Sequence, residues 1–427
     1  MRLQLAGLVA LVVLGAAVAS AGWWDRATDL RGSAAAATPA APAADAVARG
    51  ADLARIGHCA GCHTARGGAD FAGGRRIATP FGSVVAANLT PDAETGLGRW
   101  TPAAFRRALH EGRSSDGRAL LPVCPYPNFS LVEAADADDL LAYLQSLPPV
   151  RHAVPAHELR FPYGLPVALT AWRLLNFRPA TLAEAPFTAS ASADAAVRRG
   201  AYLVGGLGHC SACHGQRDRW GATAGAWDFR GGVMPGEGWL APSLADAQAA
   251  GMAGWSADEA LALLKNGRNM QATVSGPMAL VVAGSLQHGR DADLQAMVAF
   301  LRQLPAPPAA PRNPAAAPDA AVLQLGEKVY ERHCADCHGK AGEGVADAGP
   351  ALAGNRALAL ASPVNVVRMV LAGGFGPSTA AEPRPLGMPP FATLLSDEEV
   401  AAVVTHMRWR HGRQAAGVNA FDVNGQR

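Results

Sequence analysis

Apolar residues recur at helical spacing along most of the chain, and the alternation that is typical of strands is scarce. The pattern repeats in three stretches of similar length, which we number in chain order: 47–150, 196–304 and 319–412. Each stretch opens with a short helical pattern that leads into a cysteine, and each closes with a helix that starts on polar or acidic residues. A repeat of this kind indicates one small structural unit used several times. We therefore predict an all-α protein with three small domains in tandem.

Local signals predict a middle helix in each stretch. Ser256 and Glu259 have the spacing of a capping box, and Pro102 and Pro363 suit the first position of a helix. Gly112 and Gly267, each followed by an arginine, suit the C-terminal ends of the first two of these helices.

The segments outside the three stretches have a different character. Residues 1–24 run apolar almost without interruption after Arg2, which fits either a cleaved signal peptide or a retained membrane anchor. Both interpretations place the rest of the chain on the periplasmic side of a bacterial inner membrane. The other segments are an Ala/Pro tether at 25–46, a proline-punctuated interdomain segment at 151–195, a Pro/Ala linker at 305–318 and a polar tail at 413–427.

Charge and composition narrow the range of partners. The chain has 37 Lys and Arg residues against 35 Asp and Glu residues, and only 17% of its residues are charged. A nucleic-acid-binding protein normally carries a basic stripe or a strongly basic domain. We therefore expect no nucleic-acid partner.

The sequence Cys-x-x-Cys-His occurs once in each stretch. It is the attachment pattern of haem c: two thiols three positions apart form thioethers with one porphyrin, and the adjacent histidine lies under the iron. A thioredoxin-like pair would need a βαβ setting, and a zinc site would pair two such motifs in one small domain. We therefore predict three covalently bound haem c groups. The predicted attachment residues are Cys59, Cys62, Cys210, Cys213, Cys334 and Cys337, and the predicted proximal ligands are His63, His214 and His338.

A histidine precedes each motif, at His58, His209 and His333. The residue before the motif is directed away from the iron by the backbone geometry. We therefore interpret these three as packing residues beside the haem rather than as ligands.

A haem that only carries electrons usually has a second axial ligand, and methionine is the one expected in small domains of this kind. In the third stretch Met388 stands in Leu-Gly-Met-Pro-Pro-Phe, just before the closing helix, whereas Met369 and Met407 fall on helices and are expected in the core. In the second stretch Met278 stands in Ser-Gly-Pro-Met, again ahead of the closing helix. Its competitors are Met234, Met252, Met270 and Met297.

The first stretch contains no methionine. Cys124 stands at the corresponding place, in Leu-Pro-Val-Cys-Pro-Tyr-Pro-Asn-Phe, and it is the seventh cysteine, with no free cysteine left to pair with in the chain. Three interpretations stay open. Cys124 is an axial thiolate that lowers the potential of the first haem, or an inert buried thiol, or part of an intermolecular disulfide. In the second case His110 or His152 ligates the iron, or the iron is left open.

These motifs resemble those of the triple-haem cytochrome c subunits of bacterial membrane-bound dehydrogenases, over residues 47–410. Three segments carry the resemblance: Cys-Pro-Tyr-Pro-Asn-Phe at 124–129, Gly-Pro-Met at 276–278 and Gly-Met-Pro-Pro-Phe at 387–391. The first segment normally reads Met-Pro-Tyr-Pro in that family, so Cys124 departs from the pattern. The resemblance implies a catalytic partner subunit that is a quinoprotein, a flavoprotein or a molybdenum enzyme. It also implies electron flow through three haems to ubiquinone or another respiratory acceptor.

The alternative class is a haem enzyme that works at the Cys124 haem, either a thiosulfate- or sulfur-oxidising cytochrome or a peroxidase. Cys124 is the feature that favours it. The methionines in ordinary positions of the other two stretches favour a relay that has no catalytic activity alone.

Overall fold

The computed structural model describes residues 43–187, 194–234, 236–308 and 315–427. The apolar segment 1–24, most of the tether and part of the 305–318 linker lie outside these residues. Among the helices of the described ranges, none has both the length and the apolar character that a membrane span requires.

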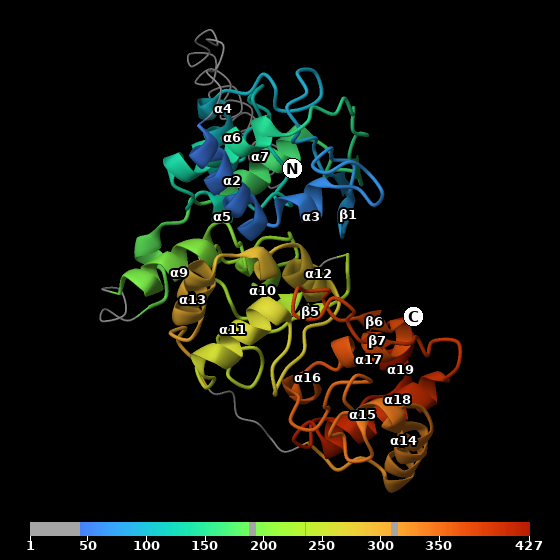
Figure 1. Cartoon of the computed structure of the whole chain (residues 1–427). Helices are drawn as coiled ribbons and strands as arrows, with labels where there is room; N and C mark the ends of the chain where they lie inside the picture. The colour runs from blue at the N-terminus through green and yellow to red at the C-terminus, as the bar shows by residue number, and fades with distance from the viewer. Residues whose placement is uncertain (1–42, 188–193, 235, 309–314) are drawn as a thin grey trace, which may run out of the picture. The chain divides into compact units, whose positions relative to one another are not determined.

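The chain divides into two compact units (Figure 1). Helices α2 (Ala44–Ile56) and α3 (Cys59–His63) cross the boundary between them. The other elements of the first unit are β1 (Arg76–Thr79), β2 (Gly82–Val85), α4 (Pro102–Glu111), α5 (Tyr126–Phe129), α6 (Ala134–Ser146), β3 (Glu158–Leu159) and α7 (Pro166–Asn176). Strands β1, β2 and β3 form a small antiparallel sheet in that order.

The second unit contains the third stretch and the second stretch except Asp218–Gly225, which belong to the first unit. Its elements up to the linker are η1 (Leu182–Glu184), α9 (Ala195–Gly205), α10 (Ser211–His214), β4 (Gly232–Val233), β5 (Leu240–Ala241), α11 (Ala257–Asn266), α12 (Pro277–Gly284), η2 (Leu286–His288) and α13 (Asp291–Leu301). After the linker come α14 (Ala320–His333), α15 (Ala335–His338), α16 (Arg356–Ala359), α17 (Val364–Ala372), β6 (Gly374–Phe375), β7 (Gly387–Met388), α18 (Asp397–Arg410) and α19 (Ala420–Asn424). The predicted helix-rich character is confirmed, and the strands of this unit form two-stranded antiparallel ladders, β4–β5 and β6–β7.

In each stretch the opening helix crosses the closing helix at a glycine. A Cβ atom built on Gly50 of α2 would lie 1.9 Å from the carbonyl oxygen of Asp139 in α6. On Gly200 of α9 it would lie 1.9 Å from that of Ala296 in α13. Real Cβ atoms do not come this close to another atom, so only glycine lets the two helix backbones touch.

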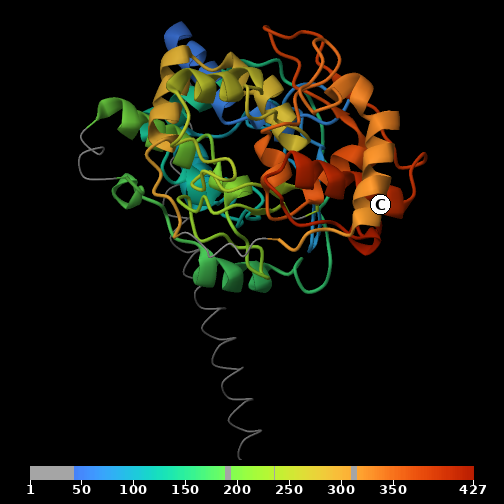
Figure 2. The ribbon, with the colours of Figure 1, turned by 90° about the horizontal axis from the view of Figure 1, so that it is seen from below.

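The third crossing joins α14 to α18, which Figures 1 and 2 show in orange and red from two directions. A Cβ on Gly326 would lie 2.2 Å from the carbonyl oxygen of Ala402. Val400, Val403 and Val404 of α18 are completely buried below this crossing. The core of the third stretch is therefore built on the helix pair that precedes and follows the predicted haem motif.

An ionic cluster ties the second helix pair together. The Asp293 carboxylate at the start of α13 accepts hydrogen bonds from Arg199 of α9 at 2.9 Å and from Arg290 at 2.7 Å. Burial raises the pKa of Asp293, but the two guanidinium groups outweigh it and hold the pKa below its ordinary value. The carboxylate is therefore ionised and paired at neutral pH.

Two segments are more ordered than their sequence predicts. The interdomain segment contains α7, which starts at Pro166 and has an amphipathic pattern between irregular stretches. The polar tail contains α19, which begins with a capping box between Asn419 and Asp422 and buries Val423 completely. The buried guanidinium of Arg408 in α18 donates to the carbonyl of Ala416 at 2.9 Å and so holds the tail against the domain.

Candidate haem sites

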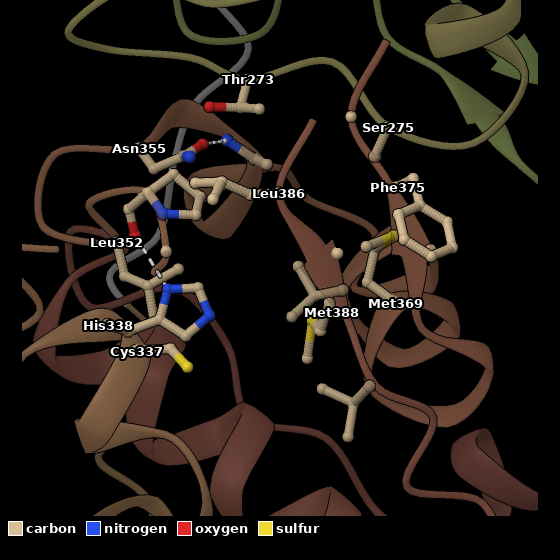
Figure 3. A pocket seen from close by; sticks show the side chains of 18 of the residues that line it. Thr273, Ser275, Cys337, His338, Leu352, Asn355, Met369, Phe375, Leu386 and Met388 are labelled. Carbon is tan, nitrogen blue, oxygen red and sulfur yellow. Dashed lines mark hydrogen bonds between the residues drawn. The ribbon is translucent and has the colours of Figure 1, made fainter. Parts of the chain in front are cut away.

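The third Cys-x-x-Cys-His motif opens onto a cavity with mostly apolar walls. We call it the third cavity because it belongs to the third motif. Its lining includes Cys334, Cys337 and His338 of the motif and Met388 of β7. Figure 3 shows the His338 ring and the Met388 side chain entering this cavity from opposite sides. The structure thus brings together the predicted proximal ligand and the predicted sixth ligand of the third haem.

Met388 is held in place by the short hairpin of β6 and β7. Gly374 pairs with Met388 in the antiparallel ladder, and Gly373 ends α17 with a φ of 63°. A Cβ on Gly373 would lie 2.3 Å from the carbonyl oxygen of Met388. Glycine at this position therefore lets the segment that carries the methionine pass close to the end of the helix.

Met369 corrects one of our expectations. It was expected in the core, but it lines the cavity together with Asn365, Val366 and Val370 of α17. These four residues share one face of the helix, and that face is turned toward the cavity. Met407 lies in the core, as expected, with 4% of its surface exposed, and it also lines the cavity.

The proximal histidines share one hydrogen bond. Nδ1 of His338 lies 2.8 Å from the carbonyl oxygen of Pro350. In the same way, Nδ1 of His214 lies 2.7 Å from that of Pro242, and His63 makes this bond to another main-chain carbonyl. A carbonyl can only accept, so Nδ1 carries the hydrogen and Nε2 presents its lone pair to a metal. All three rings are thus oriented as iron ligands.

A glycine lies next to the backbone of each of these three hydrogen bonds. The amides of Gly73, Gly231 and Gly344 donate to the carbonyls of the three motif histidines at 2.7, 2.6 and 2.7 Å respectively. All three glycines have a φ between 75° and 81°. A Cβ built on any of these three glycines would lie within 2.7 Å of a main-chain atom. That atom belongs either to the residue whose carbonyl accepts the histidine hydrogen bond or to the next residue in the chain. Sequence reasoning missed these residues because they follow the motifs at three different spacings.

The surroundings of the motifs fit the chemistry of haem c. Burial lowers the pKa of His63 and of His214, which favours the neutral imidazole that a metal needs. When bound, a haem c held by these residues supplies a one-electron couple.

In the second stretch, side-chain exposure narrows the choice of sixth ligand. Met270 is 86% exposed, which is unsuitable for a ligand inside a domain. Met252 and Met297 are buried in the core, with 3% and 1% exposed. Met234 and Met278 are both half-buried, so exposure does not choose between them. Met278, at the start of α12, stays the predicted ligand of the second haem.

In the first stretch the structure places Cys124 near the haem motif. Burial raises the pKa of the Cys124 thiol to about 12, and repulsion from the nearby Cys62 sulfur adds to this. The thiol is therefore neutral without a metal, whereas coordination to iron would deprotonate it.

Each of the two histidines that compete with Cys124 has one ring nitrogen in a hydrogen bond to a main-chain carbonyl. Nε2 of His110 lies 2.8 Å from the carbonyl oxygen of Val132, and Nδ1 of His152 lies 2.8 Å from that of Ala72. The His152 bond has the same form as those of the motif histidines and leaves Nε2 available, so these bonds do not choose between the histidines and Cys124. Cys124 stays the predicted sixth ligand of the first haem.

The histidines that precede the motifs occupy packing positions. The ring of His333 lines the third cavity and meets Phe391 edge-on, with 6.0 Å between the ring centroids. His58 and His209 have φ values of 48° and 37°, a conformation that is uncommon outside glycine. The Nδ1 atom of His209 lies 2.7 Å from the carbonyl oxygen of Leu207.

The attachment motif, the oriented histidine and the facing methionine define a c-type cytochrome. The family model of cytochrome c matches residues 47–148 and 323–410, which are most of the first and third stretches. The cytochrome c subunit of alcohol dehydrogenase (quinone) from Gluconacetobacter polyoxogenes is 36% identical over 409 residues, covering 92% of this chain and 86% of that protein. The gluconate 2-dehydrogenase cytochrome c subunit of Pantoea cypripedii is 35% identical over 394 residues, covering 88% of both chains.

A shorter relative is the diheme cytochrome c-type protein of Cereibacter sphaeroides. It is 34% identical over 264 residues, covering 60% of this chain and 86% of that protein. The chain belongs to the family of cytochrome c proteins that includes the alcohol and gluconate dehydrogenase subunits. The predicted resemblance is confirmed, and so are covalent haem c as the cofactor and electron transfer as the activity.

Proposed function

We propose that the chain carries three haem c groups, one in each predicted domain, and acts as the electron-transfer subunit of a dehydrogenase on the periplasmic side of the inner membrane. The observation that carries the proposal is the third cavity, where His338 and Met388 face each other. An iron held between an imidazole and a thioether has no open position for a substrate. Such a site is suited to passing electrons.

The chain's own residues do three things in this proposal. The carbonyl behind each motif histidine fixes the ring and its tautomer. The apolar walls of the third cavity exclude water, which favours the form of the haem with the smaller net charge. Met388 would be the second protein ligand of the third haem, and we assign the same role to Met278 and Cys124 for the other two haems.

The names of the relatives support the choice of partner. They are subunits of alcohol dehydrogenase (quinone) and gluconate 2-dehydrogenase. We infer that this chain receives electrons from a catalytic subunit with a quinone, flavin or molybdenum cofactor. It passes them to ubiquinone or another respiratory acceptor, and residues 1–24 or the partner hold it at the membrane.

A pull-down of the tagged full chain from detergent-solubilised membranes tests this assignment. Mass spectrometry and cofactor analysis should find a large subunit that carries pyrroloquinoline quinone, flavin or molybdopterin. Addition of that subunit's substrate should then reduce the haem bands. A chain that comes out alone and fully haem-loaded would rule out the dehydrogenase-subunit function.

A second candidate function rests on Cys124, whose buried sulfur lies near Cys62. A haem with a cysteine ligand is the working site expected of a thiosulfate-oxidising cytochrome. Steady-state turnover of thiosulfate or peroxide by the isolated chain would favour this candidate, and its loss in a Cys124→Met variant would locate the activity.

A further inference from the structure

The third cavity is walled by two of the three stretches. Helix α11 ends at Gly267, and the chain then turns back in a hairpin where Arg268 pairs with Thr273 and the Val274 amide donates to the Gly267 carbonyl at 2.8 Å. Arg268, Thr273 and Ser275 of the second stretch line the cavity that contains His338 and Met388 of the third. Figure 3 shows Thr273 and Ser275 at its rim. We call residues 267–274 the hairpin.

The hairpin is fixed to the third stretch at its base. Nε of Arg268 lies 3.2 Å from Oε2 of Glu382. Gly267 has a φ of 78°, and a Cβ built on it would lie 2.3 Å from Cγ of Pro377. Closeness of this kind leaves no room for water between the hairpin and the loop that carries Pro377 and Glu382.

Both flanks of this contact are held by hydrogen bonds. The side-chain amide of Gln287 donates to the carbonyl of Ser378 at 2.9 Å and accepts from the amide of Ala380 at 3.0 Å. At the tip of the hairpin, the amide of Arg356 donates to the carbonyl of Gln271 at 3.1 Å. The third cavity therefore has a fixed wall that its own domain does not supply.

The ion pair in this wall gives the two residues opposite effects on a haem in the cavity. Arg268 and Glu382 both line it, with side chains 52% and 22% exposed. Reduction adds one negative charge to a haem, so a nearby cation favours the reduced form and a nearby anion the oxidised form. The less exposed carboxylate is screened less by solvent.

We propose that the hairpin is a working part of the third haem site, and that Arg268 and Glu382 are positioning residues whose charge balance sets the reduction potential of the third haem. This inference rests on the proposed function, because it requires a haem attached at Cys334 and Cys337. It adds that the second domain controls the potential of its neighbour.

The test is a potentiometric titration of the full haem-loaded chain, followed by visible absorbance. The reduction transition of the third haem is identified as the one that is missing from a Cys334→Ala/Cys337→Ala chain. Arg268→Gln should lower its potential and Glu382→Gln should raise it. We expect each variant to change the reduction equilibrium about threefold to tenfold, with tenfold equal to 59 mV. The double variant should return close to the wild type.

Arg302→Gln is the matched control, since it removes the charge of an exposed arginine of the same unit that does not line the cavity. The inference is overturned if both single variants behave like this control, or if both shift the potential in the same direction. A Cys334→Ala/Cys337→Ala chain that loses no transition would instead overturn the three-haem function itself. The two failures are therefore distinguishable.

Closure of the cavity is tested separately with added imidazole. Gly267→Ala should displace the hairpin from Pro377 and let imidazole change the spectrum of the third haem. Gly254→Ala is the control, because a Cβ there has no neighbour within 4 Å among the described residues. Equal resistance of both variants to imidazole would show that the hairpin does not close the site.

Discussion

Replacing Gly326 by alanine is expected to destabilise the third stretch, although alanine is normally the better helix former. The new Cβ would lie 2.2 Å from the carbonyl oxygen of Ala402 and 2.7 Å from Cβ of His406. The first of these is a backbone atom that no rotamer change can move, so α14 and α18 have to separate. Overpacking of this kind costs roughly 1–3 kcal/mol, whereas helix propensity returns about 1 kcal/mol. Because the close contact is with a backbone atom that cannot move aside, we expect the upper part of this range, about 2–3 kcal/mol, and hence a net loss of about 1–2 kcal/mol.

Hydrogen exchange measured by mass spectrometry reads this effect locally, on peptides from α14 and α18 of the full haem-loaded chain. A loss of 1–2 kcal/mol should lower protection in both helices roughly 5- to 30-fold. Lys328→Ala, on the exposed face of the same helix, is the control and should change little. Protection in the Gly326→Ala variant that equals or exceeds the wild type would refute the packing argument.

Three further predictions concern the sites and the ionic cluster. Cys124→Met should raise the reduction potential of the first haem by more than 59 mV, which is a tenfold change in the reduction equilibrium, because a neutral thioether replaces a thiolate. An unchanged potential in a spectroelectrochemical titration would reject thiolate ligation. Gly344→Val should keep the haem attached, as judged by haem staining of denaturing gels. It should alter the absorption spectrum of the third haem, because the Pro350 carbonyl could no longer reach His338. A wild-type spectrum would count against this. The lowered pKa of Asp293 means that its contribution to stability is present at neutral pH and lost as the pH falls below about 4. Thermal unfolding across this range should therefore depend less on pH in Asp293→Asn, and an equal dependence would argue against the ion cluster.

Local signals in the sequence predicted the closing helices well. We expected them to begin near Asp136, Asp291 and Ser396, and they begin at Ala134, at Asp291 and directly after Ser396. The capping box between Ser256 and Glu259 is confirmed at the start of α11. Such signals depend on residues within one turn of each other, so the sequence displays them directly.

The hydrogen bonds that orient the motif histidines could not be predicted in this way. The acceptor of His214 is the main-chain carbonyl of Pro242, which any residue could supply, so no side-chain signal marks it. The need for glycine at position 231 is recognised only when its φ of 80° and the atoms around it are known. The hairpin depends on packing between the second and third stretches, which no local pattern encodes.

We propose that one chain carries three haem c groups that pass electrons. A coulometric titration of the purified full chain, with its concentration fixed by amino-acid analysis, tests this proposal. We expect three electrons per chain, taken up in one-electron steps by haem that stays attached after denaturation. An uptake of one or two electrons per fully loaded chain would contradict it.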